Sequence, residues 1–175
     1  PTNQTAVGGV HNGLACAVNA AARGHHVTMF DALPEIGGQC NIAKQIPGKE
    51  EFHETLRYYR TMRDLHGVDL RLNTRVTTDD LLAFDETILA TGIAPRLPAI
   101  DGIDHPKVLS YLDVLRDKAP VGAKVAIIGC GGIGFDTAMF LSQSGVATSQ
   151  DIGEVLRGRG FGLALYHICL LRPKQ

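Results

Sequence analysis

One stretch near the end of the sequence constrains the fold most: KVAIIGCGGIGFDTAMFL, from Lys124 to Leu141. An apolar run precedes a glycine loop with the spacing G-x-G-x-x-G, and a run typical of a helix follows it. In a dinucleotide-binding unit, such glycines allow a tight turn, close approach of the backbone to pyrophosphate, and close helix–strand packing. The glycines of this loop are Gly129, Gly131, Gly132 and Gly134. The stretch predicts nucleotide binding at a helix N-terminus, with a purely structural glycine turn as the alternative.

A second strand–glycine–helix pattern lies earlier, at residues 5–24. Its loop, VGGVHNGL, has Gly8 and Gly13 at the outer positions of the motif but Val10 at the middle one. A branched side chain at that position would intrude where the pyrophosphate lies, unless the turn shifts by one residue and Gly9 takes its place. This internal repeat predicts two nucleotide-binding units in one chain.

An acidic residue follows the first loop at the expected distance. Asp31 ends the next predicted strand, about twenty residues beyond the glycines, where a carboxylate accepts hydrogen bonds from ribose hydroxyls. The alternative is that Asp31 is a solvated strand end.

Periodicity and breaker residues predict the other elements. We expect a short first strand at residues 5–7, because Asn3 and Gln4 are poor strand formers. A proline-rich linker is expected at residues 94–106. The expected helices cover residues 12–24, 49–67 and 108–117; the expected strands cover residues 25–31, 68–76, 86–92, 124–128 and 163–171; and residues 32–48 are an expected loop. The apolar stripe of the second helix is Phe52, Leu56, Tyr59, Met62 and Leu65.

Composition excludes several function classes. The net charge of -1 provides no general attraction to nucleic acid or to an anionic membrane. The four cysteines form no C-x-x-C pair, the histidines show no metal-ligand spacing, and no nucleophile–base pair is evident, so we expect neither a metal site nor a catalytic side chain. Reduced cysteines fit a cytoplasmic protein, and no apolar stretch is long enough to span a bilayer.

Two further segments complete a resemblance. EIGGQ (Glu35–Gln39) and ETILATGIAPRLP (Glu86–Pro98), together with the two glycine loops, resemble the flavoprotein family with paired FAD and NAD(P) domains. In that family the A-T-G segment ends the strand that crosses toward the nicotinamide domain, and the double-glycine loop passes near the flavin pyrophosphate. The resemblance therefore assigns to the flavin site Gly37, Gly38, Gln39, Ala90, Thr91 and Gly92. Taken alone, the double glycine would be an ordinary loop.

Longer runs, such as NIAKQIPGKEEFHETLRYYR, resemble bacterial NADPH-dependent 2,4-dienoyl-CoA reductases over about residues 5–151. The resemblance implies an α/β, Rossmann-like three-layer FAD/NAD(P)-binding fold that is incomplete. It implies an FAD-binding domain over residues 1–120 and the truncated start of an inserted NAD(P)-binding domain over residues 121–175.

The activity of that family follows a fixed relay: hydride passes from NADPH to FAD, and electrons then pass through an iron–sulfur cluster to FMN. A barrel domain finally reduces the dienoyl thioester in the β-oxidation of unsaturated fatty acids. Nothing in this chain resembles the FMN site, the cluster or the barrel, so a further domain or a partner chain would supply them.

Three further observations bear on the expectation. Disulfide reductases have C-x-x-x-x-C after the double glycine, but here Gln45 stands where a partner of Cys40 would be, which excludes a redox disulfide. The segment that completes the family's flavin domain is missing. Arg172 and Lys174 correspond to basic residues that suit an NADP 2′-phosphate, or form a basic solvated tail. The alternative function is a truncated, nucleotide-binding remnant without turnover.

Overall fold

The computed structural model describes residues 1–142. The chain forms two compact units: unit 1 comprises residues 1–43 and 51–96, and unit 2 comprises residues 44–50 and the chain from residue 97 onward. No helix among the described residues is both long and apolar enough to cross a membrane. Arg172, Lys174 and the strand predicted at residues 163–171 lie outside the described residues.

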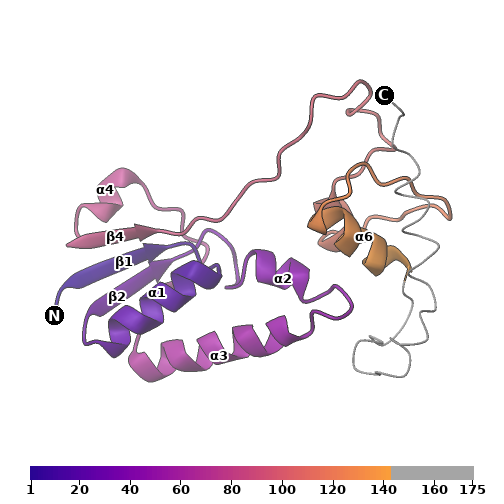
Figure 1. Cartoon of the computed structure of the whole chain (residues 1–175). Helices are drawn as coiled ribbons and strands as arrows, with labels where there is room; N and C mark the ends of the chain where they lie inside the picture. Colours follow the sequence, from indigo (N-terminus) through magenta and orange to yellow (C-terminus); the bar gives the residue numbers. More distant parts are fainter. Residues whose placement is uncertain (143–175) are drawn as a thin grey trace, which may run out of the picture. The chain divides into compact units, whose positions relative to one another are not determined.

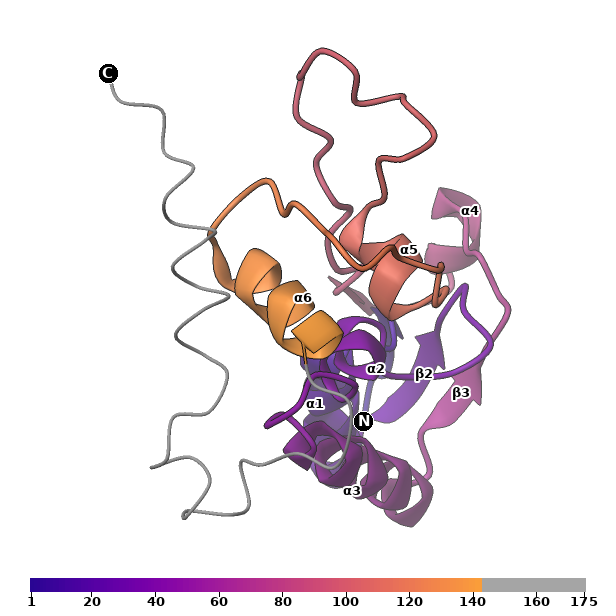
Figure 2. The same cartoon turned by 90° about the vertical axis from the view of Figure 1, so that its right-hand side faces the viewer.

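Unit 1 is built on a parallel sheet of four strands in the order β3-β2-β1-β4 (Figures 1 and 2). Its strands are β1 (Asn3–Val7), β2 (His26–Phe30), β3 (Asp69–Arg71) and β4 (Glu86–Leu89). All three strand pairings are parallel. This strand order is that of a Rossmann half, in which ligands bind beyond the carboxyl ends of the strands. The predicted α/β class is confirmed.

Helices cover one face of this sheet (Figure 1). They are α1 (His11–Ala22) and α3 (Glu51–His66), which also pack against each other. Small alanine side chains on α1 let the helix approach the strands closely. The core between the layers consists of Ala6, Leu14, Ala17, Val27, Met29, Ile36 and Val68.

Unit 2 contains two helices among its described residues, α5 (Tyr111–Leu115) and α6 (Gly132–Ser142), which pack together. Ser110 begins α5 with a capping box: its hydroxyl accepts from the Asp113 amide at 3.2 Å, and the Asp113 carboxylate accepts from the Ser110 amide at 2.6 Å. The linker predicted at residues 94–106 contains neither helix nor strand.

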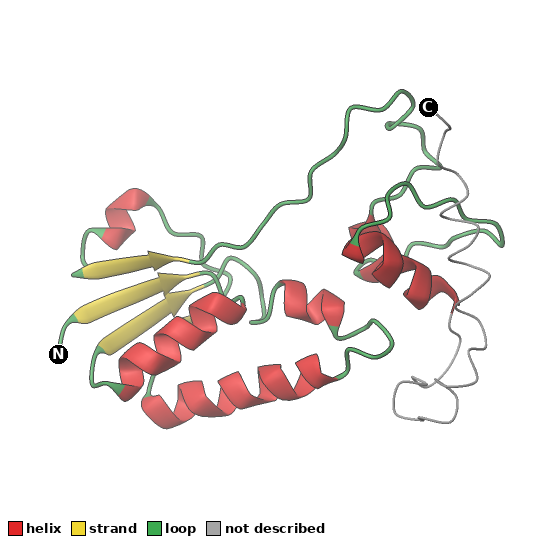
Figure 3. Ribbon diagram, in the orientation of Figure 1, coloured by secondary structure: helices red, strands yellow, loops and turns green. Residues whose placement is uncertain are grey.

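One predicted strand does not form. Residues 124–128 precede α6 as extended loop (Figure 3), with Ile128 77% exposed. A parallel strand exists only where a neighbouring strand completes its hydrogen bonds. Residues 97–142 of unit 2 contain no second strand to do so, which explains why strand propensity alone was misleading here.

Other boundaries also differ from the prediction. The first strand begins at Asn3 rather than at residue 5, because Asn3 and Gln4 pair with β2 in parallel register. The strand predicted at residues 68–76 ends at Arg71, and soon afterwards Asn73 takes a positive φ of 52° that ends extended structure. Leu65, placed on the apolar stripe, is 70% exposed because α3 turns it away from the core.

Two short helices were not predicted. The loop expected at residues 32–48 contains α2 (Gln39–Ala43), and α4 (Thr78–Leu81) precedes β4. Helices of four or five residues carry too little periodicity to be recognised from sequence. In α4 the first-turn carboxylate of Asp80 accepts from the Thr77 amide at 2.7 Å, which stabilises the helix start.

Candidate dinucleotide-binding sites

The first glycine loop joins β1 to α1 with almost no free space. Gly8 has φ +110°, and a Cβ built on it would lie 2.1 Å from the carbonyl oxygen of Ala90. A Cβ on Gly13 would lie 2.0 Å from the carbonyl oxygen of Gly8. Both distances are shorter than any real contact, so the turn and the start of α1 require glycine at these two positions.

The A-T-G segment meets this loop because β4 pairs with β1. The Ala90 amide donates to the Val7 carbonyl at 2.8 Å, which extends the ladder by one residue beyond β4. Gly92 then turns the chain with φ +79°. Ala90, Thr91 and Gly92 therefore lie beside the N-terminus of α1.

The double-glycine loop is hydrogen-bonded to the first glycine loop. The Gly37 amide donates to the Gly9 carbonyl at 2.7 Å. Gly37 and Gly38 both have positive φ, 120° and 47°, and Gln39 begins α2 directly after them. The fold thus brings together three segments that lie far apart in the sequence.

Val10 lies where these three segments meet. Its Cγ1 would be 3.1 Å from a Cβ on Gly38, and its Cγ2 would be 3.6 Å from a Cβ on Gly92. Its isopropyl group therefore fills space that both glycines leave open. Gly9 does not take the place of the missing middle glycine, because it leaves no free space: a Cβ on it would lie 2.4 Å from the Oδ2 atom of Asp31.

Asp31 is buried, with 7% of its surface exposed, and it is not a solvated strand end. Its Oδ2 accepts from the Gly9 amide at 2.5 Å, and its Oδ1 accepts from the Leu33 amide at 2.8 Å. Two backbone donors thus compensate for burial of the carboxylate. The structure brings Asp31 to the glycine loop, and its contact with a ribose stays a prediction.

A pocket of about 360 Å³ opens at the N-terminus of α1. It is lined by Val10, His11, Asn12, Leu89, Ala90, Thr91, Gly92 and Ile93. No side chain caps α1, and the first amides of a helix have no acceptor within it, so this end of the pocket suits an anion. Sequence reasoning missed His11 and Asn12, although their position directly after Val10, at the helix start, was a usable signal.

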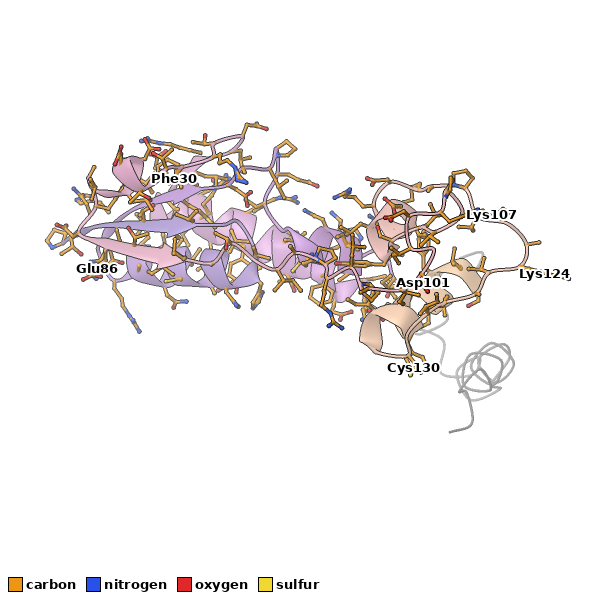
Figure 4. The ribbon with its side chains drawn as sticks, turned by 90° about the horizontal axis from the view of Figure 1, so that it is seen from above. Phe30, Glu86, Asp101, Lys107, Lys124 and Cys130 are labelled. Carbon is orange, nitrogen blue, oxygen red and sulfur yellow. The ribbon has the colours of Figure 1, made fainter. Side chains whose placement is uncertain are left out.

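The second glycine loop repeats the geometry of the first within unit 2. Gly129 has φ +112°, and a Cβ on Gly134 would lie 2.3 Å from the Gly129 carbonyl oxygen. In contrast with Val10, the middle position is open: a Cβ on Gly131 or Gly132 would meet nothing within 4 Å. Cys130, labelled in Figure 4, lies exposed just before α6.

Cys40 shows no sign of redox pairing. It is a free, buried cysteine, and burial raises the pKa of its thiol above the ordinary value, against a weaker opposing effect of a backbone hydrogen bond. A protonated thiol is a poor nucleophile. Within residues 1–142, moreover, no group of three or more metal-ligating side chains could hold a metal ion.

Comparison with known proteins extends these observations. The family described as pyridine nucleotide-disulphide oxidoreductase matches residues 5–161. The cinnamate reductase of Clostridium sporogenes is 40% identical over 147 residues, which cover 79% of this chain and 21% of that enzyme. The bilirubin reductase of Mediterraneibacter gnavus is 36% identical over 146 residues, which cover 82% of this chain and 23% of that enzyme.

A solved structure of 2-naphthoyl-CoA reductase, in complex with 2-naphthoyl-CoA, aligns with 96% of this chain and 27% of its own. Its TM-score is 0.77 and its sequence identity is 30%. The chain therefore spans about a quarter of the length of this structure, and 21% and 23% of the two related reductases.

Proposed function

Since the chain belongs to the pyridine nucleotide-disulphide oxidoreductase family, we propose that its two glycine loops hold two different dinucleotides. The first loop, in the part of the chain before residue 120, would hold FAD. The second, in the part from residue 121 onward, would hold NADPH. In the whole protein, the two nucleotides would exchange a hydride, which is chemistry that the cofactors supply and the protein positions.

The observation that carries this proposal is the repeated geometry of the two loops. The first glycine of each has nearly the same φ, +110° for Gly8 and +112° for Gly129. A Cβ on the third glycine of each loop would meet the carbonyl oxygen of the first, at 2.0 Å for Gly13 and 2.3 Å for Gly134. A turn that only connects a strand to a helix would not need the same two close contacts in two separate units.

The residues of unit 1 fit a flavin nucleotide in their donor chemistry. The uncapped start of α1 presents backbone amides to a pyrophosphate, and the A-T-G segment and the double-glycine loop supply backbone close by. Asp31 holds the glycine loop in place through the Gly9 amide. These residues would bind and orient the nucleotide, and none of them needs to transfer a proton.

The residues of unit 2 fit the pyrophosphate of a nicotinamide nucleotide. Gly131 and Gly132 leave open space at the N-terminus of α6, where backbone can approach a phosphate closely. The choice of NADPH over NADH follows from the resemblance to dienoyl-CoA reductases and from Arg172, which lies outside the described residues.

The finer proposal concerns the whole protein, of which this chain matches about a quarter. We propose that it reduces an unsaturated acyl-CoA thioester, as in the β-oxidation of dienoyl-CoA. The sequence resemblance supports this, and so does the similarity to 2-naphthoyl-CoA reductase in complex with 2-naphthoyl-CoA. An FMN site, an iron–sulfur cluster and a barrel would come from a further domain or a partner chain. Reduced cysteines support a cytoplasmic location.

Flavin retention tests the first part of the proposal. The purified chain is mixed with FAD and desalted, and the visible flavin absorbance that stays with the protein is measured. Retained flavin supports the proposal, while loss of all flavin on desalting would show that this chain does not bind FAD. NADPH-dependent reduction of ferricyanide or of a tetrazolium dye then tests turnover.

A second candidate is a nucleotide-binding module without turnover, and the placement of Val10 favours it. The side chain of Val10 occupies space beside Gly38 and Gly92 in which a flavin pyrophosphate would pass. In that case NADPH would bind to the second loop, but the chain would retain no flavin and reduce no dye. Flavin-dependent dye reduction would eliminate this candidate.

A further inference from the structure

A short segment between two helices of unit 1 belongs to unit 2. Residues 44–50 connect α2 to α3, yet their contacts are with the residues from 97 onward. The sequence IPGK explains their shape: the Lys49 amide donates to the Ile46 carbonyl at 3.0 Å, and Gly48 has φ +87°. Proline followed by a glycine of positive φ makes a type II turn. Ile46, the residue before this turn, is 1% exposed.

The turn directs Lys49 onto the helix that follows the second glycine loop. The Lys49 Nζ donates to both carboxylate oxygens of Asp136 on α6, at 2.8 Å to Oδ1 and 2.6 Å to Oδ2. The two side chains are 37% and 23% exposed. Lys118 holds the same segment at a second point, because its ammonium donates to Gln45 and lies 4.4 Å from the centroid of the Phe140 ring.

The negative charge of Asp136 is unfavourable for the binding of an anion at the N-terminus of α6. Asp136 lies four residues after Gly132, the first residue of α6. Four residues of helix correspond to about 6 Å along the helix axis. A carboxylate there is within about one Debye length of an anion bound at the helix N-terminus, so it repels a pyrophosphate unless its charge is compensated. Lys49 provides that compensation from outside the helix.

We propose that Lys49 is a positioning residue for the second dinucleotide site. It neutralises Asp136 and thereby lets the N-terminus of α6 accept the pyrophosphate of a nicotinamide nucleotide. The inference rests on the proposed function of this loop. It adds to the site a residue that precedes the loop by about eighty positions and lies outside the G-x-G-x-x-G motif.

The experiment is a double-mutant cycle on the full chain. NADPH binding is measured by the change in its fluorescence for the wild type, Lys49→Met, Asp136→Asn and the double variant. Lys49→Met should weaken binding on the order of tenfold, and added salt should reduce this difference. In the double variant the affinity should return to within about twofold of the wild type, because the charge that needs compensation is gone.

Lys107→Met is the matched control, since it removes an exposed lysine of the same unit that pairs with no carboxylate among residues 1–142 (Lys107 is labelled in Figure 4). It should leave NADPH affinity unchanged. Hydrogen exchange of the α6 amides monitors the helix independently of any nucleotide: similar exchange in the wild type and in Lys49→Met assigns the loss of affinity to charge rather than to unfolding.

The outcomes separate this inference from the proposed function. If the wild type binds NADPH and Lys49→Met binds equally well, or if the double variant binds as weakly as Lys49→Met, the role of Lys49 is overturned and the dinucleotide site stands. If the wild type binds no NADPH, the proposed function of the second loop fails, and the role of Lys49 with it. Faster exchange of α6 in Lys49→Met would make Lys49 a structural residue and overturn the inference too.

Discussion

The carboxylate of Asp31 accepts a hydrogen bond from the backbone amide of Gly9 at 2.5 Å, in a position where only 7% of Asp31 is exposed. The end of β2 thus holds the glycine loop that follows β1. The other carboxylate oxygen accepts a hydrogen bond from the Leu33 amide at 2.8 Å, so each oxygen has a backbone donor. Asp31, for which we predict a ribose contact, therefore also determines the shape of the loop between β1 and α1.

Asp31→Asn should destabilise unit 1 by about 1–3 kcal/mol, because the amide NH₂ would face one of the two backbone donors and leave it without an acceptor. Chemical denaturation measures this change. Asp85→Asn is the control: Asp85 accepts from the Asn3 amide at 2.7 Å in an exposed position, where water replaces a lost bond. Equal effects of the two substitutions would contradict a special role for the buried carboxylate.

Val10→Gly should raise flavin affinity, because it removes the methyl groups that lie against Gly38 and Gly92. Glycine is also well tolerated where α1 begins. Val10→Ala should give an intermediate affinity, since it removes the same methyl groups but keeps the Cβ atom. Titration of each variant with FAD measures the order. Identical affinities for the three proteins would place the defect in the flavin site elsewhere.

Gly134→Ala should abolish NADPH binding, because the added Cβ would meet the Gly129 carbonyl oxygen at 2.3 Å and push α6 away from the loop. We expect an overpacking cost of about 1–3 kcal/mol in unit 2. Gly122→Ala is the matched control, since a Cβ there meets nothing within 4 Å. Both variants are compared by NADPH fluorescence and by thermal unfolding. Equal nucleotide affinity in the two would contradict the assignment of the second loop.

Gly13→Ala should act in the same way on unit 1 alone. Its Cβ would lie 2.0 Å from the Gly8 carbonyl oxygen, so flavin retention should fall while NADPH binding by the second loop persists. Measurement of both nucleotides on one sample of the variant checks this separation. Loss of both would show that the two loops do not bind independently.

Stability should fall at alkaline pH in a way that depends on Cys40. Burial raises the pKa of its thiol in the folded chain, so the unfolded chain releases this proton first as pH rises through about 8.5, the ordinary thiol value. The contribution of Cys40 to the free energy of unfolding is thus complete below that pH and is lost as the pH rises above it. Burial also raises the pKa of Tyr59, which adds a similar loss at higher pH.

Urea denaturation of the wild type and of Cys40→Ala across this pH range measures the effect, and the decline should be shallower in the variant. The exposed Cys130 provides an internal control for accessibility: iodoacetamide should modify Cys130 well before Cys40 in the folded chain. Parallel curves for the wild type and Cys40→Ala would show that another group causes the alkaline decline.

Much of the fold was predictable because its signals are local. The spacing of Gly8 and Gly13 predicted a turn followed by a helix, and the structure confirms both, since the two glycines meet within six residues of chain. The amphipathic pattern of α3 likewise predicted a long helix, with Leu56 inside the core. The α/β class was predicted through the resemblance to paired FAD and NAD(P) domains, and the parallel sheet confirms it.

Other features depended on contacts between distant segments. Strand propensity at residues 124–128 was real, but a strand needs a hydrogen-bonding neighbour, and the described part of unit 2 provides none. The turn at Pro47 and Gly48 was recognisable as a breaker, yet nothing in its sequence indicated that Lys49 would reach Asp136, 87 residues later.

By itself, then, the sequence determined the two glycine turns and the helices that start from them, because bond geometry and short-range sterics act within a few residues. Only the tertiary structure decided what those turns face. It placed Val10 beside Gly38 and Gly92, buried Asp31 against Gly9, and paired Lys49 with α6. Each of these contacts depends on how strands and loops from separate parts of the chain pack, and packing is a property of the whole fold.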